Sequence, residues 1–101
     1  MKPLLDFEWD PAKDETNRRR HGISFEEVKE LFTSGVDYLE IFDDEHSQDE
    51  DRFIAIGPTP RGVVLVVYTE PSEGVVRIIS ARRATKAETR LFWQHMRTKD
   101  E

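Results

Sequence analysis

The sequence contains no cysteine. Without cysteine the chain has neither a disulfide framework nor a thiolate metal site, and we expect an intracellular, cytoplasmic protein. It also lacks an apolar run that could span a membrane and the hydrophobic segment of a signal peptide, so we expect no membrane association. The Gly-rich phosphate loop, the serine nucleophile elbow and the His-Glu-x-x-His zinc motif are absent as well. These absences argue against P-loop, serine-hydrolase and zinc-protease chemistry.

The charges are numerous and unevenly distributed. Charged residues make up 36% of the 101 residues and hydrophobic residues 37%, which predicts one folded, highly charged domain over residues 1–101. The net charge of −6 argues against a generic coat for nucleic acid. Residues 36–60 hold eight acids against one base, Arg52, and we call residues 37–51, which contain all eight, the acidic lobe. Residues 77–99 hold seven bases against one acid, Glu88.

Hydrophobic periodicity divides the chain into eight elements. Strands are expected at 5–9, 36–42, 52–57, 63–70 and 75–82, and helices at 11–21, from 25 to about 34, and at 85–97. Pro58 should stop the third strand, and residues 71–74 should connect the last two strands as a hairpin. Leu91, Trp93 and His95 are the expected packing residues of the last helix. The order β-α-α-β-β-β-β-α predicts an α+β fold with helices packed on a mostly antiparallel sheet.

The end of the last strand carries two arginines, Arg82 and Arg83, just before a helix. Thr85 and Glu88 have the spacing of a capping box, in which each side chain accepts a hydrogen bond from the backbone of the other. Guanidinium groups beside a helix N-terminus suit a phosphate. In the alternative interpretation, one arginine pairs with the acidic lobe and the other is solvated.

The first helix carries a polar stripe. Lys13, Asn17, Arg20 and His21 have helical spacing and share one face. This stripe either is a solvated face whose basic residues complement the C-terminal helix dipole, or it faces a ligand.

Two further groups are weaker candidates. The acidic lobe contains His46, but its spacing does not match an EF-hand loop, so a solvated acidic turn is favoured over a metal site. Glu70 ends the strand at 63–70, and antiparallel pairing places it several residues away from Arg82 along the sheet.

Motifs along nearly the whole chain resemble the BrnT family of bacterial toxins. They include Phe7-Glu8-Trp9-Asp10-Pro11, His21-Gly22-Ile23-Ser24-Phe25, Val67-Tyr68-Thr69-Glu70 and Ser80-Ala81-Arg82-Arg83-Ala84-Thr85. The resemblance implies a RelE-like fold and a ribonuclease activity that blocks translation. It also implies neutralisation by a BrnA-like antitoxin, which binds operator DNA in the complex.

The resulting hypothesis is a metal-independent endoribonuclease without a cofactor. Its expected catalytic residues are Arg82, Arg83, His21 and Glu70, and its expected RNA-binding residues are Lys13, Asn17, Arg20, Arg77 and Lys86. One alternative is a non-enzymatic protein-binding module that uses the acidic lobe. A DNA-binding regulator is a weaker alternative, because no helix-turn-helix pattern is evident.

Overall fold

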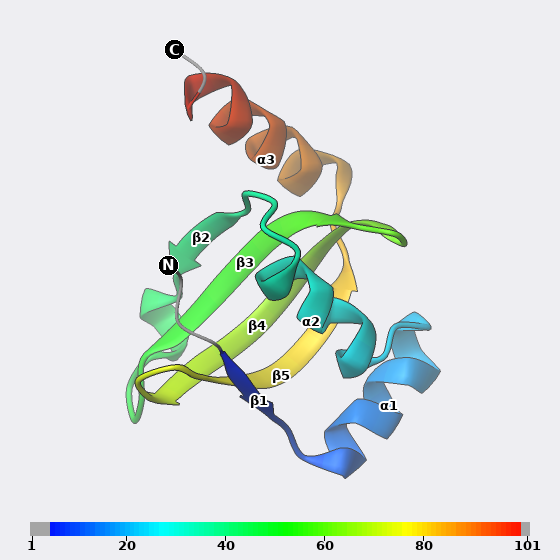
Figure 1. Cartoon of the computed structure of the whole chain (residues 1–101), viewed down its shortest axis with the longest axis vertical. Coiled ribbons are helices and arrows are strands. Elements are labelled where there is room, and N and C mark those ends of the chain that lie inside the picture. The colour runs from blue at the N-terminus through cyan, green and yellow to red at the C-terminus, as the bar shows by residue number, and fades with distance from the viewer. Residues whose placement is uncertain (1–4, 100–101) are drawn as a thin grey trace.

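Five strands form one sheet in the order β1-β5-β4-β3-β2, with helices on both faces (Figure 1). The computed structural model describes residues 5–99. The elements are β1 (Asp6–Glu8), α1 (Pro11–His21), α2 (Phe25–Thr33), β2 (Leu39–Phe42), a 3-10 turn (Asp44–His46), β3 (Arg52–Thr59), β4 (Gly62–Ser72), β5 (Val75–Arg83) and α3 (Lys86–Lys99). The predicted fold class and element order are therefore confirmed. No helix within residues 5–99 is long and apolar enough to cross a membrane.

The sheet is antiparallel except at one edge. β1 runs parallel to β5, whereas β2, β3, β4 and β5 pair antiparallel in turn. β3 continues through Pro58, contrary to the prediction. β2 begins opposite Ile56, so the last residues of β3 have no strand on that side, and proline is tolerated at such an edge. The hairpin between β4 and β5 is also tighter than expected, with Ser72 paired to Val75.

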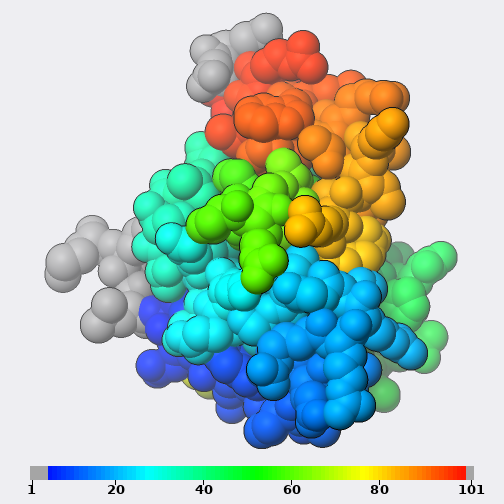
Figure 2. Space-filling model, turned by 90° about the vertical axis from the view of Figure 1, so that its right-hand side faces the viewer, coloured from blue at the N-terminus to red at the C-terminus, as the bar shows by residue number. Residues whose placement is uncertain are grey.

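Two hydrophobic clusters lie on opposite faces of the sheet. The larger one lies on the α1–α2 side of the sheet and joins α2 to the strands through buried residues that include Phe25, Val28 and Leu31. The smaller one lies under α3 and contains Ile56, Leu65 and Phe92. In the side view, the α1–α2 pair and α3 lie at opposite ends of the visible face, with the turn between β3 and β4 between them (Figure 2).

Local signals set both N-terminal helices. Asp10 caps α1 by accepting a hydrogen bond from the backbone N–H of Ala12 at 2.9 Å, and Gly22 ends the helix with a φ of 69°. The hydroxyl of Ser24 caps α2 by accepting from the N–H of Glu27. These caps confirm the predicted boundary between the helices, and they hold α1 and α2 as a bent pair.

The packing face of α3 differs from the prediction. Leu91 and Trp93 are 48% and 51% exposed, whereas Phe92 is buried, Met96 packs beside it, and His95 is partly buried. Phe92 and Met96 are four residues apart and therefore share one helix face. α3 is therefore oriented with Phe92 and Met96 toward the sheet, and Leu91 and Trp93 are exposed to solvent.

Candidate functional site

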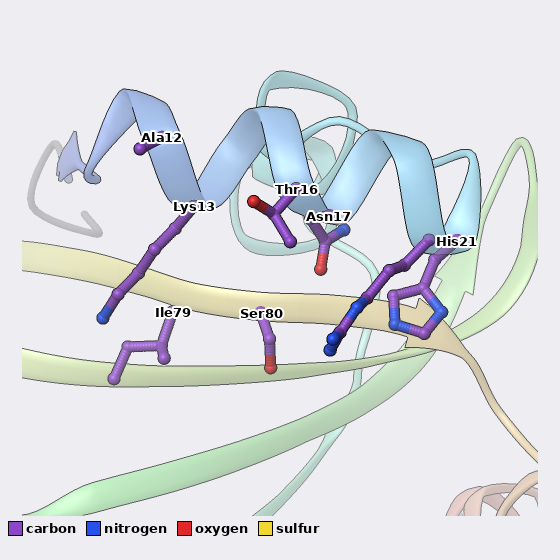
Figure 3. A pocket seen from close by; sticks show the side chains of 8 residues that line it. Ala12, Lys13, Thr16, Asn17, His21, Ile79 and Ser80 are labelled. Carbon is purple, nitrogen blue, oxygen red and sulfur yellow. The ribbon is translucent and has the colours of Figure 1, made fainter.

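A groove of about 370 Å³ lies between α1 and β5 (Figure 3). Its lining residues are Ala12, Lys13, Thr16, Asn17, Arg20, His21, Ile79 and Ser80. In the close-up, the side chain of Lys13 hangs from α1 beside Ile79, and His21 lies near the C-terminal end of β5. The polar stripe of the first helix thus lines an open groove that is accessible to a ligand.

The groove exists because β1 is short. β1 pairs with β5 only as far as Glu8 and Arg77, so the rest of the outer edge of β5 has no strand beside it. α1 takes that position, and Asn17 makes the connection. Its Oδ1 accepts a hydrogen bond from the N–H of Ala81 at 3.0 Å, and its Nδ2 donates to the carbonyl of Ile23 at 2.9 Å. The side chain of Asn17 therefore replaces a neighbouring strand at this point.

The burial of Asn17 changes the role that the sequence suggested for it. The residue is only 5% exposed, and each end of its amide is bonded to the main chain. This environment does not fit the predicted direct contact with RNA. It fits a positioning residue, which aligns α1 with β5 and so places Lys13, Arg20 and His21 along the strand.

A second hollow of about 340 Å³ continues the groove toward β1. It shares Lys13 and Ile79 with the first and adds Arg77, Trp9 and Glu8. The guanidinium of Arg77 pairs with the carboxylate of Glu8 at 2.9 Å, and both side chains are nearly half exposed. Arg77 therefore lies next to the groove with a competing, solvent-screened partner.

Arg82 is held by α3. Its guanidinium donates two hydrogen bonds to the Glu88 carboxylate, at 2.7 and 2.9 Å. Glu88 also accepts from the N–H of Thr85, whose hydroxyl accepts from the N–H of Glu88, so the predicted capping box is confirmed. The hydrogen bonds from Arg82 lower the pKa of Glu88 to about 2, and the same pairing raises the pKa of Arg82. The partner of Arg82 is thus Glu88 and not the acidic lobe.

Arg82 and Arg83 leave the strand toward opposite faces of the sheet. Arg82 pairs across the sheet with Leu65, which belongs to the cluster under α3, whereas Arg83 pairs with Val64 of the α1–α2 cluster. The side chain of Arg83 is exposed and donates to the carbonyl of Arg61. The two guanidiniums therefore do not converge on one anion as the sequence suggested.

Two further predicted site residues, like Arg82 and Arg83, do not line the groove. Glu70 is exposed near the end of β4, and its charge helps to raise the pKa of Tyr38 and Tyr68, although burial is the larger cause for both. Lys86 is the first residue of α3 and lines a separate shallow hollow with Trp93. The structure gathers Lys13, Asn17, Arg20 and His21, places Arg77 beside them, and separates Glu70 and Lys86 from them.

The acidic lobe is organised as a turn. Asp43 accepts from the ring Nδ1 of His46 at about 3.0 Å, and the hydroxyl of Ser47 bonds to the main chain of Asp43 and Arg52. Within the described part of the chain, no three histidine, aspartate or glutamate side chains are arranged to hold a metal ion. The lobe therefore has the geometry of a solvated acidic turn.

Four residues that line the groove were not among the predicted site residues: Ala12, Thr16, Ile79 and Ser80. Thr16 lies three residues after Lys13, so helical spacing alone could have identified it. Ile79 could not have been found in this way, because it is the extra residue of a β-bulge. Val67 pairs with Ser80, but the next residue, Tyr68, pairs with Ile78.

Comparisons with known proteins identify the family and the fold. The model of a family described as the ribonuclease toxin BrnT of type II toxin–antitoxin systems matches residues 9–88. The fold is similar to that of the Brucella abortus ribonuclease toxin BrnT, whose crystal structure was determined at 1.1 Å resolution. The TM-score is 0.61 at 23% identity, over 82% of this chain and 100% of the other. The chain matches no curated protein sequence.

Replacement of Asn17 by alanine is expected to destabilise the protein by at least about 1–3 kcal/mol, because it leaves buried backbone groups at Ala81 and Ile23 without partners. The measurement is the free energy of unfolding in urea. Thr16→Ala is the matched control, since Thr16 is exposed on the same helix. Equal stability of the Asn17 and Thr16 variants would show that Asn17 does not hold α1 to the sheet.

The Arg82–Glu88 pair predicts a specific pH dependence. The pKa of Glu88 falls from 4.5 to about 2 on folding, so its stabilising effect is complete above pH 4.5 and is lost as the pH falls toward 2. The stability difference between the wild type and Glu88→Gln should therefore be largest near neutral pH and shrink in acid. Glu15→Gln, which removes an exposed glutamate, provides the control. A Glu88→Gln effect that is the same at neutral and acid pH would contradict this assignment.

Proposed function

Because the chain belongs to the BrnT family of ribonuclease toxins of type II toxin–antitoxin systems, we propose that it cleaves RNA in the groove between α1 and β5. The observation that carries this proposal is the row of Lys13, Arg20 and His21 along one wall of the groove. Two cations suit the phosphates of an RNA strand, and an imidazole can transfer protons near neutral pH. Ser80 adds a hydroxyl on the opposite wall.

The reaction needs no nucleophile from the protein, because RNA carries one. The 2′-hydroxyl of the ribose loses its proton and attacks the adjacent phosphorus. The bond from phosphorus to the 5′-oxygen breaks, and that oxygen takes up a proton. The products are a cyclic 2′,3′-phosphate and a 5′-hydroxyl. The protein must therefore position the strand, transfer two protons and stabilise the charge that develops on the phosphate.

The groove residues and the arginines of β5 divide these tasks. His21 is the candidate acid or base, while Lys13 and Arg20 bind the phosphates on either side of the scissile bond. Arg77 extends the binding surface toward β1, and Arg83 is the freer of the two strand-end arginines for stabilising phosphate charge. Arg82 acts through Glu88, since that pair fixes the start of α3 beside the end of β5. Glu70 and Lys86 take no part in this scheme.

The same proposal covers the biological role of the protein. A type II system supplies a protein antitoxin, and we expect this partner to cover the groove, because burying Arg20 and His21 is the direct way to stop cleavage. Operator DNA would then be bound only by the antitoxin in the complex. The substrate would be cytoplasmic RNA in use for protein synthesis, so that its cleavage inhibits translation.

Two adjacent arginines of α1 offer a sharp test. Arg20 lines the groove, whereas Arg19 is exposed outside it and pairs with Glu15. Arg20→Ala should therefore lower the rate of RNA cleavage by about tenfold or more, and His21→Gln by about 100-fold or more, as expected for loss of a general acid or base. Arg19→Ala, which removes the same charge from the same helix, should cleave like the wild type. Equal rates for the Arg19 and Arg20 variants would place the reaction elsewhere.

Cleavage should persist when divalent metals are removed. The proposed chemistry uses the ribose hydroxyl, His21 and the basic groove residues, so a purified sample in EDTA should keep its cleavage rate. A sample that EDTA inactivates and magnesium or manganese restores would contradict metal independence. In that case the acidic lobe, with its carboxylates and His46, would become the place to search for the metal.

A further inference from the structure

β2 presents an unpaired backbone edge at the side of the sheet opposite β1. Among the described residues, β2 pairs only with β3. The N–H of Asp43 donates to the carbonyl of Arg52 at 2.8 Å, which identifies the inward-facing positions of this antiparallel pair. Hydrogen-bonded positions alternate along such a strand, so Glu40 and Phe42 turn their backbone N–H and C=O groups outward. The edge therefore offers two donor–acceptor pairs to another strand.

The side chains along this edge are unusually apolar for an exposed position. Ile41 is 37% exposed and Phe42 is 47% exposed, and Val36, just before the strand, is 42% exposed. Phe42 rests against Phe53, with their ring centres 5.6 Å apart. Successive strand residues point to opposite faces, so an added strand would meet Ile41 on one face and Phe42 on the other. Each face thus retains apolar surface that a neighbouring strand could bury.

The charges around β2 indicate which kind of molecule can bind its edge. Eight acids and no lysine or arginine occur in residues 37–51, which contain β2. A second copy paired through the same edge would bring these acids against each other, which disfavours a homodimer. RNA would be repelled for the same reason. A polypeptide with basic side chains would gain favourable charge contacts together with backbone hydrogen bonds.

We propose that the β2 edge and the acidic lobe bind an extended, basic segment of a partner protein, which adds to the sheet as a sixth strand. Its apolar side chains pack on Ile41 and Phe42, and its basic side chains lie beside Glu40 and the lobe. The site is separate from the RNA groove, because β3 and β4 lie between β2 and β5 (Figure 1). Three interstrand spacings amount to about 14 Å. RNA and the segment can therefore be bound at the same time.

The test uses the full chain, labelled with ¹⁵N, and a peptide of ten residues in which lysine alternates with valine. Addition of the peptide should shift the backbone amide signals of Glu40 and Phe42 and should slow their hydrogen exchange. Binding should weaken as salt is added. A peptide of the same length with glutamate in place of lysine should not bind. RNA cleavage by the complex should continue at the rate of the free protein.

Two variants at one position separate backbone pairing from side-chain packing. Phe42→Ala keeps the outward N–H and should bind the peptide more weakly. Phe42→Pro removes that N–H without removing a hydrogen bond to β3, and it should weaken binding by about a further tenfold. Both variants should retain RNA cleavage, which also serves as the check on folding.

Three results would overturn the proposal. The first is equal binding of the lysine peptide to Phe42→Pro and to Phe42→Ala. The second is a set of amide shifts confined to the α1–β5 groove. The third is protection of the Glu40 and Phe42 amides in the free protein through dimerisation by β2. Because cleavage is measured separately, failure of this proposal and failure of the RNA groove assignment give different results.

Discussion

The amide of Asn17 is the contact on which the arrangement of the site depends. A strand edge buried against a helix would leave backbone groups without partners, and such groups cost about 1–3 kcal/mol each. Asn17 satisfies the N–H of Ala81 and, through Ile23, fixes the turn into α2. This side chain therefore sets the position of α1 along β5. Together with the helix caps and the hydrogen bond from the N–H of Phe25 to the Asp14 carboxylate, it also sets the bend between the helices. Lys13, Arg20 and His21 take their places in the groove as a consequence.

Signals that act over a few residues could be interpreted from the sequence. The capping box at Thr85 formed as expected, and the caps at Asp10, Gly22 and Ser24 likewise depend on spacing within one or two helical turns. The same holds for the order of strands and helices, which follows from hydrophobic periodicity. The polar stripe of α1 was also identifiable, although its spacing alone could not show whether it faced solvent or a groove.

Contacts between distant parts of the chain could not be predicted in this way. The hydrogen bond between Asn17 and Ala81 joins residues 64 positions apart, and no local sequence pattern at either residue predicts it. The bulge at Ile79 has a larger effect, because an extra residue reverses the alternation of the strand beyond it. Without the bulge, Arg82 would point toward the α1–α2 face. With it, Arg82 lies on the α3 face, where it reaches Glu88, and Arg83 lies on the opposite face.

A protein with a net charge of −6 can act on RNA only if its charges are separated in space. The sheet provides this separation, since the basic groove lies along β5 and the acidic lobe surrounds β2. Two strands between them give about 14 Å, which exceeds the Debye length of about 8 Å at physiological salt. Exposed acids at the β2 edge are therefore largely screened at the groove and repel RNA mainly at their own side. Under the proposed function, the acidic lobe would repel RNA from the β2 side without weakening phosphate binding in the groove along β5.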